Sequence, residues 1–489
     1  MSYGRVLRNF AALFFLFLSY YLIKPLRNSQ FLKEFPPHAL PLIYLVVSLL
    51  SLGITRMFQW AEPRLSRRAL VTTTFAWAAL GKLYFYFALP QAGQSGTVQF
   101  YLFASVYFLL LVSTLWGCLN ERFLPDQAGR CFAWIALGST LGGIAGAQAA
   151  HWMADGRWGY GCLLWSALAL VCSLLLLWPE LRWPVVSPPR RTNPRQKETW
   201  YQEVSLRSIA TMVLCLAVFS TALDLISQQR LDEALGSQVY VEKVSQGLPG
   251  YTAGTAEFSR LRGYPESQRK QRLAEMAEQA GVSPPQMELL FGHYQQQLEI
   301  GLRTTFASIS RGQGVLGVVV LGLLCRPFLM RFGLAPSLRL LPSFALLALP
   351  LLLLPLEVSW VEWIVILSGT LNYSFNNATK EVLYTAAPRS MLMQAKPFIE
   401  GPLMRLGDVL CAVITLACAG LIRGLGRPHG EAAILMVALC WGTILYWWWQ
   451  VGQAGRAYQH LLSARDTSPP PPETTPREAG DEATTHPAH

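Results

Sequence analysis

The sequence predicts an all-α integral membrane protein with twelve transmembrane helices in two halves of six. Of its 489 residues, 52% are apolar and only 14% are charged, whereas soluble domains carry about 25% charged residues. Apolar runs of about 20 residues, the length that crosses a bilayer, recur along the whole chain. The net charge of +11 is concentrated in short loops and at helix ends, which is typical of membrane topology and not of a nucleic-acid surface.

The apolar runs define the spans in order. The twelve expected spans are 9–32, 38–60, 69–89, 98–119, 131–151, 160–178, 206–227, 304–325, 337–356, 360–384, 397–422 and 430–451. The first follows Arg5 and Arg8, as a secretory signal would. Because no small-residue cleavage site follows it, we expect a retained helix.

The distribution of basic residues indicates the orientation. With both termini inside, the inner segments hold Arg64, Arg67, Arg68, Arg122, Arg130, Arg190, Arg191, Arg326 and Arg331, and the short outer loops hold Lys33, Arg157, Arg423 and Arg427. This asymmetry follows the positive-inside rule. No organellar transit segment precedes the first span. We therefore expect a multi-pass protein of the cell inner membrane with both termini cytoplasmic.

Two polar segments divide the chain further. The expected parts are an N-terminal six-helix half (1–178), a cytoplasmic connector (179–205), the first helix of the C-terminal half (206–227), an outer soluble insertion (228–303), the rest of that half (304–463) and a disordered tail (464–489). The insertion is helix-prone from Glu266 to Leu298 with a break at Pro284-Pro285, so we expect a small helical lobe. Similar residues enter the fifth span at 127–132 and the eleventh at 394–398. Two related six-helix halves are typical of the major-facilitator architecture.

Charged residues within the spans mark candidate functional positions, because a charge in the bilayer normally faces a cavity or a partner. Lys24 and Arg27 flank Pro25 in the first span, where the missing proline N–H leaves backbone groups that need polar company. This pattern favours an anion site. The other candidates are Asp224, Lys380, Glu381, Glu400, Arg405 and Asp408, with Glu121 and Arg130 in an inner loop.

Structural interpretations remain open for several of these residues. Arg405 and Asp408 are three residues apart on one helix and could simply neutralise each other. Glu121 and Arg130 are expected to form conformational salt bridges or to be solvated. Lys82 could snorkel or pair, and Arg311 is expected near an outer helix end.

Motifs of enzymatic chemistry are absent from the sequence. It contains no GxxxxGK[ST] loop, no HExxH and no GxSxG, so we expect no enzyme and no ATP-driven pump. All nine cysteines lie in or beside apolar segments without a CxxC. They predict neither disulfides nor a metal site, and we expect no cofactor.

Two segments resemble the ATP/ADP translocases of plastids and obligate intracellular bacteria, and more closely the free-living bacterial relatives of that family. The segments are 372–384, which contains Thr379-Lys380-Glu381, and 396–408, which contains Lys396-Pro397-Phe398-Ile399-Glu400 and Arg405-Leu406-Gly407-Asp408. Weaker similarity covers Tyr21 to Arg27, Trp116, Asn120-Glu121, Arg130 and Asp224. Where the translocases have an acidic, lysine-containing run in span one, this chain has Arg27-Asn28-Ser29-Gln30.

The resemblance implies a carrier that exchanges nucleotides such as ATP and ADP, or a related organic anion, by alternating access. Lys24, Arg27, Lys380, Glu381 and Arg405 would bind the substrate. Glu121, Arg130, Asp224, Glu400 and Asp408 would balance charge or act in gating. The alternatives are a proton-coupled carrier of another solute and a non-transporting membrane protein whose lobe at 228–303 recruits an unknown partner.

Overall fold

The computed structural model describes residues 3–61, 64–120, 125–154, 159–182, 203–244, 255–384, 395–396, 398–426 and 429–466. Within these ranges the regular structure is entirely helical. Nine helical stretches there are long and apolar enough to cross a bilayer, and the other three expected spans are helical as well. The predicted fold class, twelve helices in two halves with a small helical insertion, is confirmed. The protein is a multi-pass membrane protein.

The N-terminal half consists of six helices, of which the first packs against the fourth, fifth and sixth. They are α1 (Tyr3–Glu34), α2 (Leu40–Ala61), α3 (Arg67–Ala88), α4 (Gln94–Asn120), α5 (Pro125–Trp152) and α6 (Gly161–Arg182), with single turns η1 (Pro37–Ala39) and η2 (Leu89–Gln91). Helix α1 packs closely on α5. A Cβ at Gly142 would stand 2.1 Å from the carbonyl oxygen of Phe14, and one at Gly146 would stand 2.6 Å from that of Leu18. The glycines of α5 therefore allow close backbone approach.

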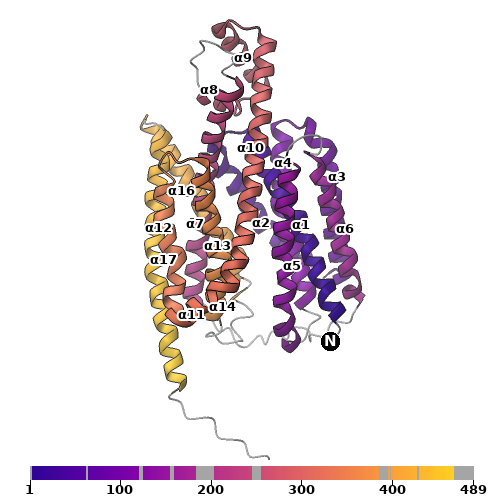
Figure 1. Ribbon diagram of the computed structural model, residues 1–489, viewed down its shortest axis with the longest axis vertical. Helices are drawn as coiled ribbons and strands as arrows, with labels where there is room; N and C mark the ends of the chain where they lie inside the picture. Colours follow the sequence, from indigo (N-terminus) through magenta and orange to yellow (C-terminus); the bar gives the residue numbers. More distant parts are fainter. Residues whose placement is uncertain are drawn as a thin grey trace, which may run out of the picture.

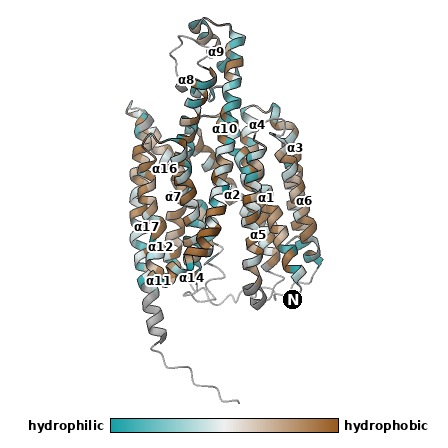
Figure 2. Ribbon diagram, viewed as in Figure 1, coloured by the Kyte–Doolittle hydropathy of each residue, from teal (hydrophilic) through white to brown (hydrophobic). Residues whose placement is uncertain are grey.

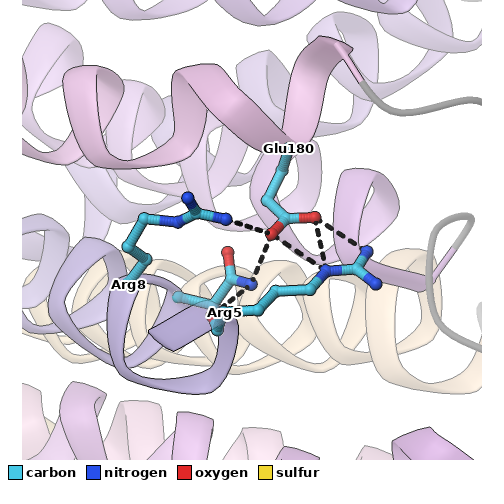
Figure 3. A network of polar contacts seen from close by, with 4 residues as sticks. Arg5, Arg8 and Glu180 are labelled. Carbon is cyan, nitrogen blue, oxygen red and sulfur yellow. Dashed lines mark hydrogen bonds and ion pairs between the residues drawn. The ribbon is translucent and has the colours of Figure 1, made fainter. Parts of the chain in front are cut away.

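A buried carboxylate joins the ends of α1 and α6 on the side of the N-terminus (Figure 3). Glu180 is fully buried. It accepts hydrogen bonds from Arg5 Nε and Nη2 at 3.0 and 2.8 Å, from Arg8 at 3.4 Å and from Asn9 at 3.2 Å. Two cations and an amide thus satisfy one buried anion, which fixes α1 against α6.

The C-terminal half contains the other six spans, and three of these spans include π-helical turns. The elements are α7 (Val204–Val239); α10 (Pro284–Val319) with η7 (Val320–Cys325) and α11 (Arg326–Phe332); α12 (Leu334–Leu351); α13 (Val358–Leu371) with η8 (Asn372–Asn376) and α14 (Asn377–Tyr384); η9 (Ile399–Leu403) with α16 (Met404–Gly424); and α17 (His429–Asp466). Helices α7, α16 and α17 pack against one another. Single π turns inside helices occur frequently at functional sites.

The insertion forms a lobe on extensions of two transmembrane helices. Helix α7 continues through η5 (Tyr240–Val244), α8 (Thr255–Leu261) and α9 (Glu266–Ala280) follow, and α10 returns to the bundle. Helix α9 ends at Gly281, whose φ of +66° suits glycine. The expected limits at 228 and 303 therefore lie inside continuous helices. The lobe is markedly more hydrophilic than the bundle (Figure 2).

The hydrophobic cores show how the parts are joined. One core lies within the N-terminal half. The other runs from the C-terminal half into the lobe through Phe258 and Tyr294, and includes Phe31, Leu40 and Tyr101 from the N-terminal half. The lobe lies at one end of the bundle, and the N-terminus and the last turns of α17 lie at the other (Figure 1). We call the lobe end the outer end and the opposite end the inner end.

Candidate functional site

Helix α1 brings two cations to a cavity between the halves. Lys24 and Arg27 are one turn apart on either side of Pro25. Arg27 donates to Asn28 Oδ1 at 2.9 Å and to Ser105 Oγ at 3.1 Å, and its guanidinium lies 4.8 Å from the centroid of the Tyr101 ring. Among the described residues, neither cation has a carboxylate within ion-pair distance. Both are half-buried, so their charges are only partly hydrated.

The cavity has a volume of about 550 Å³ and is lined by both halves. This volume is within the range of small-molecule sites. Helices α1, α2 and α4 form one wall, and α7, α10, α13, η8 and α16 form the other. Tyr20 and Phe108 stack within it with ring centroids 3.6 Å apart. Phe219 and Tyr373 add aromatic surface on the opposite wall.

Asp224 lies at the outer part of the cavity, where it connects the two halves. Tyr44 of α2 donates a hydrogen bond to the Asp224 carboxylate of α7, and Gln228 Nε2 donates to the Tyr44 hydroxyl at 2.6 Å. Arg27 is close enough to Asp224 to interact electrostatically. Since α2 and α7 belong to different halves, this contact joins the N-terminal half to the C-terminal half.

Arg405 and Asp408 of α16 also line the cavity. Arg405 Nη1 donates to Asp408 Oδ2 at 2.9 Å, and Thr221 donates to Asp408 Oδ1 at 2.7 Å. Arg405 and Asp408 therefore form the ion pair that the sequence section gives as their structural interpretation. Both side chains nevertheless line the cavity. Three cations and two carboxylates of the predicted set thus meet in one cavity.

The remaining predicted residues lie elsewhere. Lys380 is two turns past the cavity-lining Tyr373, toward the inner end, and pairs with Glu400 at 2.9 Å. Glu381 pairs with Lys396 at 2.8 Å. None of these four residues lines the cavity. Glu121 and the side chain of Arg130 lie outside the described residues.

Two further charges in the spans have neutral hydrogen-bond partners, one of them across the two halves. Lys82 is fully buried inside the N-terminal half, where it donates to Ser19 and, at 2.8 Å, to Ser166. Arg311 donates to Gln148 Oε1 at 2.7 Å. Groups of three His, Cys, Asp or Glu side chains suited to a metal ion do not occur in the described ranges.

Several cavity residues carry no charge and are therefore not marked by the pattern of charges within the spans. Tyr44, Ser105, Gln313, Asn372 and Tyr373 line the cavity, and all of them are neutral. The available signal was the presence of polar neutral residues inside apolar runs. The π turn η8 also has no strong sequence mark, although it positions Asn372 and Tyr373.

The halves are joined at the outer end. There Gln94 Nε2 donates to the carbonyl oxygens of Arg262 and Tyr264 at 3.0 and 3.1 Å, and Lys33 pairs with Glu299 at 2.8 Å. We call these five residues the outer latch. The other hydrogen bonds and ion pairs between described residues of the two halves also involve the outer parts of the helices, for example Arg269 with Glu34 at 3.6 Å. The conformation is closed at the outer end.

Arg262 anchors the latch within the lobe. Its guanidinium donates to both oxygens of Asp232 at 2.7 and 2.6 Å and to the carbonyl oxygen of Leu32 on α1. Burial alone would lower the pKa of Arg262, but the Asp232 carboxylate raises it, and the net shift is upward. The arginine therefore stays charged although it is fully buried.

The helices form a major-facilitator-like fold, with a cavity between two six-helix halves that are joined by hydrogen bonds at the lobe end. Comparison with solved structures agrees with this fold. The chain is similar to a mutant form of the nucleoside transporter NupG (TM-score 0.57, 10% identity, covering 92% of this chain and 99% of that chain). It is also similar to the POT family transporter PepTSo (TM-score 0.56, 12% identity, 94% and 99%).

A third similar structure is a POT family transporter in complex with a thioalcohol-conjugated peptide (TM-score 0.55, 11% identity, 95% and 96%). At these identities the likeness concerns the fold. No protein-family model matches the chain. No curated protein matches its sequence.

Proposed function

We propose that the protein is a secondary transporter that moves an organic anion by alternating access. The observation that carries this proposal is the cavity between the halves, which contains Lys24 and Arg27 without carboxylate partners in the described part of the chain. Partly desolvated cations bind phosphate or carboxylate groups strongly. Since the outer end is closed, the cavity would exchange its substrate at the inner end in this conformation.

A nucleotide is the substrate class we favour. The aromatic side chains Tyr20, Phe108, Phe219 and Tyr373 offer ring surface for a planar base, while Lys24, Arg27 and Arg405 would hold the phosphates. The resemblance of 372–384 and 396–408 to ATP/ADP translocases supports the same class. One of the similar solved structures is the nucleoside transporter NupG, which is compatible with a nucleotide substrate.

The charges would favour exchange over one-way transport. When the site is empty, Lys24 and Arg27 lack an anion, so closing the cavity around them would be unfavourable. A bound anion would remove that penalty in either direction. In the empty carrier, Asp224 and Asp408 would balance part of the positive charge of Lys24 and Arg27. The hydrogen bond from Tyr44 to Asp224 would break when the outer end opens.

The inner-end pairs would act in gating. Lys380–Glu400 and Glu381–Lys396 lie where the inner ends of the halves would approach in the opposite conformation. Exchange of these partners for groups of the N-terminal half would then close the inner end. Glu121 and Arg130, predicted at that end, are the candidate partners. From the distribution of basic residues, we propose that the protein lies in a cell inner membrane and that its inner end faces the cytoplasm.

A proton-coupled carrier is the second candidate function. Asp224 and Asp408 lie in the same cavity, and the two carboxylates interact electrostatically. Protonation of one of them could replace a counter-substrate. Uptake that depends on a pH gradient and needs no internal substrate would favour this alternative.

The test is uptake of radiolabelled ATP into proteoliposomes loaded with ADP. We expect Lys24→Gln and Arg27→Gln each to reduce uptake at least about tenfold, since each loses a charge-assisted contact. Lys380→Gln is the matched comparison outside the cavity, and we expect it to lower the rate without abolishing nucleotide binding. Nucleotide binding that depends on Lys380 and is indifferent to Lys24 and Arg27 would refute the site. Absence of ATP and ADP binding would refute the nucleotide assignment.

A further inference from the structure

A second cavity lies at the outer end, apart from the central one. It has a volume of about 1180 Å³. Its lining comes from the outer ends of α1, α3 and α6, from η2, and from the lobe-proximal part of α10. We call it the lateral cavity.

Arg303, which lines the lateral cavity, has no anionic partner among the described residues. Arg303 of α10 is 2% exposed, and its polar contact is from Nη2 to Cys162 Sγ at 3.1 Å. Its Nε is buried without a hydrogen-bond partner. A thiol is a weak acceptor, so the buried guanidinium charge is poorly compensated.

The nearest carboxylate is already engaged. Glu299 lies one turn before Arg303 on α10 and pairs with Lys33 at 2.8 Å. All three side chains line the lateral cavity, which therefore holds two cations and one anion. The excess charge can be neutralised by a negatively charged group that enters the cavity.

The mouth of the lateral cavity has the character of a membrane interface. Phe87, Trp165 and Leu168 line it and are 68%, 50% and 51% exposed. They belong to α3 and α6, which lie at the edge of the N-terminal half away from the C-terminal half (Figure 1). Tyr86 and Tyr160 lie beside them. Tyrosine and tryptophan at helix ends mark the level of the lipid headgroups.

We propose that the lateral cavity binds a phospholipid with an anionic headgroup, taken from the outer leaflet. The phosphate would lie near Arg303 and Lys33, and an acyl chain would follow the apolar surface of α6. A lipid is the occupant that combines an anion at headgroup level with a long apolar group. Bound there, it would connect α6 with α10 and thus stabilise the outer closure.

The experiment uses the full-length protein in neutral detergent, with melting followed by tryptophan fluorescence. Phosphatidylglycerol, phosphatidylcholine, glycerol phosphate and inorganic phosphate are added separately. We expect phosphatidylglycerol to raise the melting temperature more than the other three. We expect Arg303→Gln to weaken its apparent affinity about tenfold, the effect of one lost charge-assisted contact.

A second variant protects the test against misfolding of the arginine variant. Gly292 lines the lateral cavity, and an added Cβ there meets nothing within 4 Å. Gly292→Phe should narrow the cavity on its lobe side and weaken the effect of phosphatidylglycerol. Gly317→Phe is the matched control, because Gly317 lies on the same helix, has the same free space and does not line the cavity.

Three outcomes would overturn the proposal. The first is an unchanged phosphatidylglycerol shift in Gly292→Phe. The second is an equal shift from phosphatidylcholine, which would show that the headgroup charge is not recognised. The third is an equal shift from glycerol phosphate or inorganic phosphate, which would assign the site to a soluble anion.

Discussion

Replacing Gln94 with alanine should open the outer end of the central cavity. The side-chain amide of Gln94 makes two hydrogen bonds across the halves, to the carbonyl oxygens of Arg262 and Tyr264 at 3.0 and 3.1 Å. At about 1 kcal/mol for each bond, the closed state would lose about 2 kcal/mol relative to a state in which the bonds are already broken. That corresponds to a shift of about 30-fold in the conformational equilibrium.

The assay measures access to the cavity from the lobe side. Ser48 lines the cavity and is 2% exposed in the closed conformation. A thiol introduced by Ser48→Cys should react with a membrane-impermeant maleimide only when the outer end opens. In proteoliposomes with the lobe outside, Gln94→Ala should raise the labelling rate by about 30-fold if opening is rare in the parent protein.

Gln99→Ala provides the matched control, because Gln99 is an exposed glutamine on the same helix. The protein without Ser48→Cys gives the background from the nine native cysteines. A rise below about twofold in Gln94→Ala, equivalent to less than about 0.4 kcal/mol, would refute the latch. An equal rise in Gln99→Ala would refute it as well.

Three further substitutions test how the structure is held together. Glu180→Gln should lower the free energy of unfolding by about 1–3 kcal/mol, because it removes the buried anion with which the half-buried Arg5 and Arg8 pair. Glu233→Gln, in an exposed pair, should change it by less than about 1 kcal/mol. Both are measured by thermal melting, and equal shifts would contradict the assignment. Gly142→Leu should lower the free energy of unfolding by about 1–3 kcal/mol, because its Cβ meets the backbone of α1. Gly53→Leu, at a position with free space around it, should melt at the same temperature as the parent protein. Arg262→Gln should make the lobe more sensitive to proteolysis, because it leaves the buried Asp232 carboxylate without its cation, which costs about 3–5 kcal/mol. An unchanged digestion pattern would argue against a stabilising role of Arg262 in the lobe.

The sequence predicts the spans well because the bilayer imposes a simple condition. Every backbone polar group in the membrane must be paired within a helix, so apolar runs of sufficient length become helices. Lys24 and Arg27, on either side of Pro25, likewise stand out as charged residues within such an apolar run. Both cations do line the cavity.

The partners of the charged residues could not be predicted in the same way. Which face of a helix meets the cavity depends on the rotation and tilt of each helix, which are set by packing and not by hydropathy. Tyr44 with Asp224 and Lys380 with Glu400 each join residues on different helices. The limits of the lobe were also hidden, because no capping signal marks residues 228 and 303, where α7 and α10 run straight through.

The long helix that contains α10 has a mechanical consequence. From Pro284 to Phe332 it is one stretch of 49 residues, roughly 70 Å at about 1.5 Å per residue, more than twice the about 30 Å of a hydrocarbon core. A tilt of its lobe end would therefore be expected to displace the parts of the helix that lie within the membrane. An antibody fragment bound to the lobe would therefore restrict the movement of the transmembrane bundle. It would hold the molecule in one conformation without contacting any residue inside the membrane.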